Sequence, residues 1–151
     1  MKSSLRDNFC SSPWFHIRID PQGNYLPCRW GSQRTSLHNL ATTTISEYMN
    51  SPTMAEFRLT MLDGARSDIC KSCYYEDSQN KVSGRQRQLL KSAVTLEHFT
   101  KSFAASPHWH RFAYSADHQG LTEQQPVDLQ IDLGNVCNSA CMMCSPQYSS
   151  K

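Results

Sequence analysis

Seven cysteines carry most of the chemistry that this 151-residue sequence offers. They fall into a quartet in the first half of the chain and a triplet near residue 140. The quartet is Cys10, Cys28, Cys70 and Cys73, and the triplet is Cys137, Cys141 and Cys144. An odd number of cysteines without a secretion signal argues against a disulfide framework, because reducing compartments keep thiols free. The two groups therefore predict metal sites.

The triplet has the spacing CxxxCxxC within residues 134–146, GNVCNSACMMCSP. Three thiolates can hold three corners of a cubane iron-sulfur cluster and leave the fourth iron open to another ligand. Spacing alone leaves two alternatives, which are a zinc site completed by a ligand from elsewhere and three idle thiols. The alternating sequence VDLQIDL at 127–133 predicts a strand that leads directly into this loop.

This strand and loop resemble the first strand and cluster loop of the radical S-adenosylmethionine enzymes. The resemblance implies that Cys137, Cys141 and Cys144 bind a 4Fe-4S cluster whose open iron chelates S-adenosylmethionine. In that family the reduced cluster cleaves the sulfonium, and the resulting 5'-deoxyadenosyl radical abstracts a hydrogen atom from substrate. Met143 stands where the family normally has an aromatic residue, so packing against adenine loses a flat stacking face.

The quartet is a complete tetrathiolate, a CxxC motif with two distant partners. Such a set can hold a structural Zn(II) ion or a 4Fe-4S cluster, because both accept four thiolates. The order Cys10, Gly23, Cys28, Cys70 and Cys73 resembles the twitch domain, a short relative of the SPASM domain. The resemblance implies an auxiliary 4Fe-4S cluster that acts as an electron conduit or a structural clamp. Zinc remains the alternative.

Short elements must position the quartet. Residues 15–19 alternate apolar and polar side chains and predict a strand. The sequence DPQG at 20–23 suits a type I turn and predicts a returning strand at 25–28. Cys10 and Cys28 can then meet near the open end of this hairpin.

Helices are predicted after the hairpin. The sequence TISE at 44–47 is typical of a capping box before a short helix. Ser51 and Pro52 suit the start of a longer helix that ends at Gly64, and its Met and Phe stripe predicts a core face. Residues 85–106 lack Gly and Pro, which favours one or two further helices.

Other polar residues are interpreted as surface groups. A solvated helix face, rather than a phosphate contact, is expected for the basic cluster of Lys81, Arg85, Arg87 and Lys91. Residues 106–126 show no period and predict a linker, in which His108 and His110 are expected to be surface side chains. His16 lies on the polar face of its predicted strand and is assigned no role.

The expected fold class is α+β with three parts. Residues 1–80 form a twitch-like auxiliary domain, 81–125 a helical segment and linker, and 126–151 the start of a radical S-adenosylmethionine partial (β/α) barrel. Because a full barrel needs about 200 residues or more, we expect an N-terminal fragment that is inactive by itself. Its last strand would be an exposed edge unless it covers the auxiliary domain or meets a partner chain.

Charge and composition point to no large charged partner. The formal net charge of +2 gives no field that favours nucleic acid or a membrane surface. Without a signal peptide or a membrane-spanning run we expect a cytoplasmic protein. The resemblance implies two 4Fe-4S clusters, S-adenosylmethionine, a peptide or protein substrate and a reductant such as a flavodoxin or ferredoxin. A small zinc-binding interaction module without catalysis remains the alternative.

Overall fold

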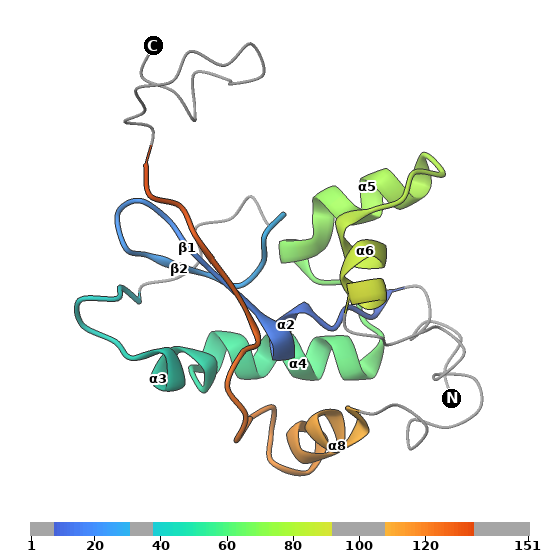
Figure 1. Ribbon diagram of the computed structural model, residues 1–151. Helices are drawn as coiled ribbons and strands as arrows, with labels where there is room; N and C mark the ends of the chain where they lie inside the picture. Colours follow the sequence, from blue (N-terminus) through green and yellow to red (C-terminus); the bar gives the residue numbers. More distant parts are fainter. Residues whose placement is uncertain (1–7, 31–37, 92–107, 135–151) are drawn as a thin grey trace.

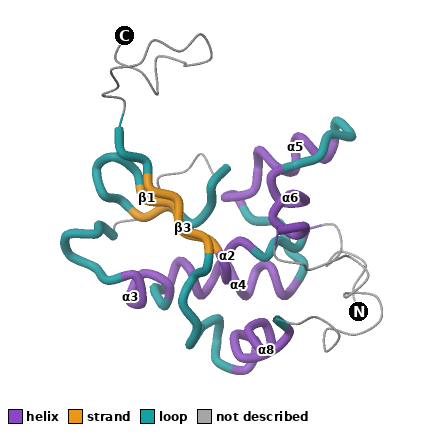
Figure 2. The backbone as a smooth tube through the Cα atoms, in the orientation of Figure 1, coloured by secondary structure: helices purple, strands orange, loops and turns teal. Residues whose placement is uncertain are grey.

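The computed structural model describes residues 8–30, 38–91 and 108–134, which form a small sheet with helices below it and to its right in Figure 1. The strands are β1 (His16–Ile19), β2 (Tyr25–Leu26) and β3 (Asp128–Ile131). The helices are α2 (Ser12–Phe15), α3 (Ile45–Met49), α4 (Pro52–Asp63), the 3-10 helix η1 (Asp68–Cys70), α5 (Lys71–Ser78), α6 (Gly84–Lys91) and α8 (Trp109–Asp117). The predicted α+β class is confirmed (Figure 2).

The sheet has the strand order β2-β1-β3. β1 pairs with β2 in antiparallel fashion, with Ile19 opposite Tyr25. β1 pairs with β3 in parallel, from His16 opposite Asp128 to Ile19 opposite Ile131. The strand before the triplet therefore covers the edge of the hairpin, which is one of the two outcomes expected for it.

The predicted turn of the hairpin is confirmed. Gly23 N–H donates to the carbonyl of Asp20 at 2.9 Å. The carboxylate of Asp20 accepts from the backbone N–H groups of Gln22 and Asn24, both at 2.9 Å. Gly23 has a φ of 82°, a left-handed conformation that a side chain disfavours. The glycine between Cys10 and Cys28 is therefore required by the turn that folds the hairpin.

The starts of α3 and α4 agree with the prediction. Thr44 Oγ1 accepts from Glu47 N–H at 3.3 Å, and the Glu47 carboxylate accepts from Thr44 N–H at 2.7 Å, which completes a capping box. Ser51 Oγ accepts from Met54 N–H at the start of α4. Gly64 ends α4 with a φ of 71°.

The core lies between α4, the sheet and α8. The apolar stripe of α4 is buried there as predicted, with Met54 and Met61 fully inaccessible. Trp14 lies at the centre, 4.9 Å from the ring of Phe112 in an edge-on arrangement. Its indole N–H donates to Ser115 Oγ at 2.9 Å. Helix α2 is thereby fixed to α8 across a large sequence separation.

Helix α8 corrects the prediction of a linker over residues 106–126. Its buried side carries Phe112 and Ser115, an amphipathic helical pattern that the prediction of a linker overlooked. After α8, Gly120 lies with a φ of 84° against the backbone carbonyl of Ala55, where any Cβ would collide. Because α8 packs on α4 and β3 pairs with β1, the second and third predicted parts both contact the first. Their boundaries stay predictions.

No helix in the described ranges combines the length and the apolar content needed to cross a membrane.

Candidate metal centre

The four cysteines of the quartet gather in one buried place from separate elements. They lie two residues before α2, two residues after β2, at the end of η1 and in the first turn of α5. Each is only 4–5% exposed. Burial, followed by the charges of Cys28 and Cys70, raises the pKa of Cys10, and Cys73 adds to the shift. The four sulfurs are therefore close enough to interact electrostatically.

Burial raises the pKa of Cys10, Cys70 and Cys73 and so favours their protonated form. Burial and then the charges of Cys28 and Cys73 raise the pKa of Cys70 to about 12. Burial also raises the pKa of Cys73. Since a cysteine ligand must lose its proton, only a strongly electropositive centre can convert these groups into thiolates at neutral pH.

Backbone N–H groups face the sulfurs of the first two cysteines. Ser12 N–H donates to Cys10 Sγ and Trp30 N–H donates to Cys28 Sγ, both at 3.4 Å. Each donor follows its cysteine by two residues. Such donors stabilise a thiolate, and in iron-sulfur proteins they also raise the reduction potential of the cluster.

Cys70 and Cys73 also have polar neighbours. The Tyr74 side chain lowers the pKa of Cys70, and the Arg85 backbone lowers the pKa of Cys73, in both cases against the larger effect of burial.

Four cysteine thiols are a complete ligand set for a zinc ion or for a 4Fe-4S cluster. Among the described residues, no three cysteine, histidine or acidic side chains are grouped tightly enough to hold one metal ion. Zinc holds all of its thiolates at about 2.3 Å, whereas in a cubane each cysteine sulfur binds a different iron.

Arg85 links two of the ligand segments. It is buried, and its guanidinium lies 2.6 Å from the Asp77 carboxylate of α5 and donates to the carbonyl of Phe9 at 3.3 Å. Phe9 precedes Cys10, and α5 carries Cys73. The interpretation of the basic cluster as a solvated face is wrong for Arg85, because its side chain is buried in contact with the Asp77 carboxylate and the Phe9 carbonyl.

Trp30 closes the site on the side of α6. A Cβ at Gly84, the first residue of α6, would collide with the Trp30 ring. Ser72 Oγ of α5 donates to the Trp30 carbonyl at 3.1 Å. The loop that follows Cys28 is thereby packed against both α5 and α6. The sequence signal for this contact is a glycine at the start of a helix.

The triplet is not part of this geometry. Cys137, Cys141 and Cys144 lie in residues 135–151, outside the described residues. Their assignment to a second cluster stays a prediction. β3 ends at Ile131, a few residues before the triplet, so the described structure places the strand that precedes it.

His16 is a buried polar residue that the sequence analysis left without a role. It is 1% exposed, and its Nδ1 lies 3.1 Å from an Asp128 carboxylate oxygen on β3. Alternation placed His16 on the polar face, but parallel pairing sets Asp128 of β3 opposite it, and the His16 side chain is buried. His110 is exposed as predicted, whereas His108 is half-buried with its ring 4.9 Å from Phe15.

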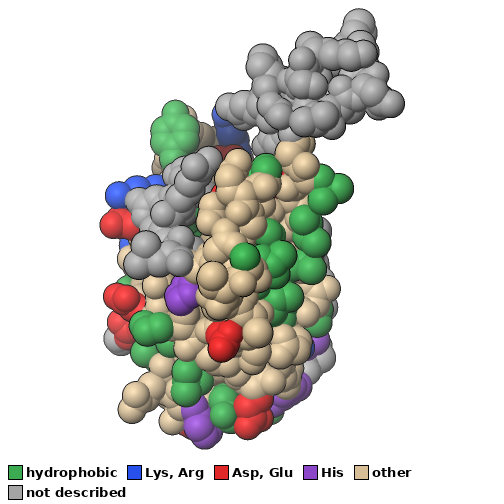
Figure 3. Space-filling view, turned by 90° about the vertical axis from the view of Figure 1, so that its left-hand side faces the viewer, with side chains coloured by type: hydrophobic (Ala, Val, Ile, Leu, Met, Phe, Trp, Pro, Cys, Tyr) green, Lys and Arg blue, Asp and Glu red, His purple; other side chains and the backbone are tan. Residues whose placement is uncertain are grey.

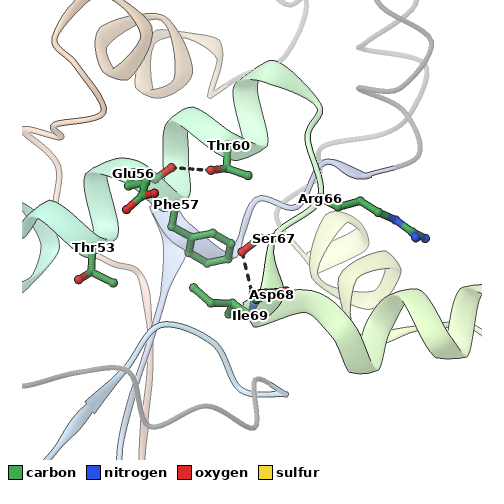
Figure 4. A pocket seen from close by; sticks show the side chains of 8 residues that line it. All are labelled: Thr53, Glu56, Phe57, Thr60, Arg66, Ser67, Asp68 and Ile69. Atoms are coloured by element: carbon green, nitrogen blue, oxygen red, sulfur yellow. Dashed lines mark hydrogen bonds between the residues drawn. The ribbon is translucent and has the colours of Figure 1, made fainter.

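A pocket of about 360 Å³ lies beside η1 (Figure 4). Its lining comes from α4 and from the segment before α5, and consists of Thr53, Glu56, Phe57, Thr60, Arg66, Ser67, Asp68 and Ile69. Ile69 N–H donates to Ser67 Oγ at 3.3 Å, and the Arg66 side chain points away from the hollow (Figure 4). None of the quartet cysteines lines this pocket, so it is separate from the candidate metal centre.

Comparison with known proteins gives one family match. The family model of SPASM, an iron-sulfur cluster-binding domain, matches residues 10–74. The matched segment begins at Cys10 and contains the whole quartet. Searches of curated proteins and of solved structures returned no match. The family match supports iron-sulfur cluster binding by this part of the chain.

Proposed function

We propose that this chain carries the auxiliary iron-sulfur site of a radical S-adenosylmethionine enzyme. The ligands of that site are Cys10, Cys28, Cys70 and Cys73. The observation that carries this proposal is the gathering of four buried cysteines inside the segment that matches the SPASM domain, with backbone N–H groups donating to Cys10 and Cys28. When bound, a 4Fe-4S cluster supplies reversible one-electron transfer.

The residues of the chain bind and shield this cluster. Four cysteine ligands leave no iron open, so the site serves as an electron conduit or as a clamp on the fold rather than as a binding site for substrate. Its burial excludes water from the ligands. Arg85 and Trp30 hold the hairpin side of the site against α5 and α6.

The proposed catalytic centre is the triplet. Cys137, Cys141 and Cys144 would hold a second 4Fe-4S cluster with one iron open to S-adenosylmethionine, for radical modification of a peptide or protein. Two features support this reading. The triplet has the CxxxCxxC spacing, and it follows a strand that pairs in parallel with β1.

The outer side of β3 supports the link to a parallel barrel. Val127, Leu129, Ile131 and Leu133 are 46–93% exposed. Figure 3 shows hydrophobic side chains gathered along the right-hand side of the molecule in that view. Parallel strands are normally covered on both faces, so an exposed apolar row on a parallel strand suits the packing of further barrel elements.

The test of the proposal is anaerobic reconstitution of the full chain with iron and sulfide. The protein should be brown, with absorption near roughly 400 nm, and should hold two clusters. Cys73→Ala should lose one cluster and Cys144→Ala the other. Added S-adenosylmethionine should alter the electron paramagnetic resonance spectrum of the reduced Cys73→Ala protein but not that of Cys144→Ala. A colourless protein with one zinc per chain would contradict the proposal and favour an interaction module.

A further inference from the structure

We propose that Arg18 couples metal binding at the quartet to the docking of β3, the strand that leads to the triplet. The inference rests on the proposed function, since it requires a metal centre on the quartet. It gives the quartet a regulatory role, because loading of that site would fix the strand that precedes the second cysteine group. Arg18 would be a positioning residue, which acts on both sites through other residues.

Arg18 bonds to a residue beside each cysteine group. Its Nε donates to Asp132 Oδ2 at 2.7 Å, and its Nη2 lies 2.5 Å from the same oxygen. Its Nη1 donates to the carbonyl of Arg29 at 3.2 Å. Arg29 directly follows the ligand Cys28, and Asp132 directly follows β3. One guanidinium therefore joins the quartet segment to the end of the strand.

A second contact links Arg29 to the start of β3. The Arg29 guanidinium lies 3.9 Å from Asp128 Oδ1, and His16 Nδ1 lies 3.1 Å from the other oxygen of that carboxylate. Asp128 and Asp132 are four residues apart, so their side chains lie on one face of the strand. Arg29 takes part in the contacts of both carboxylates, once through its side chain and once through its carbonyl.

The docking of β3 depends on these polar contacts because its other face is little buried. The side chains on that face are 46–93% exposed, and they are those of Val127, Leu129, Ile131 and Leu133. Within the described sheet, β3 is an edge strand that pairs with β1 alone. A short edge strand with few buried apolar contacts opens by local unfolding more readily than the core does. Docked and undocked β3 are therefore two states whose balance a polar contact can shift.

Metal binding would shift this balance through Cys28. A metal centre holds the Cys28 sulfur together with the other three ligands and so restricts the backbone of the residue that follows it. The Arg29 carbonyl is then fixed where Arg18 reaches it, while the same guanidinium holds Asp132. Without metal this carbonyl is less restricted, and Arg18 is held less firmly against the end of β3. Linkage is reciprocal, so a docked β3 must favour metal binding by the same factor.

The test measures amide hydrogen exchange in β3 by mass spectrometry. The N–H of Asp132 donates to the carbonyl of Ile19 at 2.9 Å and exchanges when β3 undocks. The full chain with alanine at the three triplet positions is compared with and without iron and sulfide on the quartet. The cluster should slow exchange in β3 about tenfold, towards the lower end of usual coupling factors. Exchange in α4 reports any global unfolding.

Arg18→Lys separates the coupling from the docking of β3. Lysine keeps a cation opposite Asp132 but lacks the planar set of donors that also reaches the Arg29 carbonyl. The effect of the cluster on exchange in β3 should therefore fall below about twofold. Arg87→Gln is the matched control, because Arg87 is exposed on α6, and it should keep the tenfold effect. A purely structural role of Arg18 would instead speed exchange equally with and without metal.

The possible results distinguish this inference from the proposed function. Exchange in β3 that the cluster leaves unchanged, or a tenfold effect that persists in Arg18→Lys, would overturn the coupling and leave the cluster assignment standing. If the quartet takes up zinc instead of iron and sulfide, the proposed function fails, and the same comparison with Zn(II) tests the coupling.

Faster exchange in α4 without metal would mean that the metal-free protein unfolds as a whole, and the reciprocal measurement then decides. In competition with a chelator, Arg18→Lys should bind Zn(II) about tenfold more weakly than Arg87→Gln does. Equal affinities would refute the coupling.

Discussion

The buried thiols of the quartet respond to pH in a direction that follows from their surroundings. In the unfolded chain a cysteine ionises near pH 8.5. In the folded chain burial and the neighbouring cysteines raise the pKa of Cys70 to about 12, and the pKa values of Cys10 and Cys73 are raised as well. The folded apo-protein therefore holds these protons more tightly than the unfolded chain does.

This difference predicts the pH dependence of stability in the metal-free protein. The tighter binding of these thiol protons stabilises the folded apo-protein fully below about pH 8.5. This stabilisation is lost as the pH rises towards about 12, because the cysteines of the unfolded chain lose their protons first. Cys70 alone should contribute a slope of about 1.4 kcal/mol per pH unit in that window. Urea unfolding in the presence of chelator and reductant, repeated at several pH values, measures this slope.

Cys70→Ser is the control for this prediction. Serine does not ionise in the window, so the loss of stability with rising pH should be smaller in this variant. An equal slope in both proteins would show that Cys70 keeps an ordinary pKa in the fold.

Arg85 and Arg87 offer a matched pair at the residue scale. Arg85 is buried with its ion pair to Asp77 and its bond to the Phe9 carbonyl, whereas Arg87 is exposed. Arg85→Gln should lower the free energy of unfolding by about 2–4 kcal/mol, because it leaves a partly buried carboxylate without its cation. Arg87→Gln should change it by less than about 0.5 kcal/mol. Chemical denaturation measures both, and similar losses would contradict the geometry.

At the scale of elements, local signals predicted the parts of the fold that local interactions determine. The DPQG turn, the capping box at Thr44 and the Ser51–Gly64 boundaries of α4 each depend on residues a few positions apart. Helix α8 and the pairing of β3 with β1 depend on contacts across roughly a hundred residues, such as Trp14 with Ser115. The amphipathic pattern of α8 is short and has polar residues around it, and the sequence analysis overlooked it.

In the candidate metal centre, too, the features set by nearby residues could be predicted and those set by distant contacts could not. The CxxC motif and the hairpin predicted which cysteines could approach one another. The packing of α6 on the site could not be predicted, because Gly84 meets the Trp30 ring from a distant part of the sequence.

Gly120 tests the contact between α8 and α4. Gly120→Ala should destabilise the protein by about 2–3 kcal/mol, because it combines a left-handed φ with a collision against the Ala55 carbonyl. Gly134 also has a positive φ, but a Cβ there would make only an ordinary contact with Pro21 Cβ at 3.8 Å, so Gly134→Ala should lose only about 1 kcal/mol. Thermal or urea unfolding measures both. Equal losses would mean that the close approach of Gly120 to α4 does not exist in solution.

At the scale of the whole molecule, the elements that pack around the quartet extend beyond the segment that matches the SPASM domain. The SPASM match ends at residue 74, whereas α6 packs against Trp30 and β3 completes the sheet. The exposed apolar row of β3 lies at the edge of this sheet. The strand that leads to the triplet is thus built onto the same sheet as the hairpin of the quartet, which supports a shared role for the two cysteine groups.

The most direct measurement is the metal and sulfide content of a protein that has only the quartet. The chain with alanine at Cys137, Cys141 and Cys144 is prepared without oxygen and analysed for iron, acid-labile sulfide and zinc. The account predicts about four irons and four sulfides per chain, both lost on further Cys73→Ala substitution. One zinc per chain with neither iron nor sulfide would contradict it.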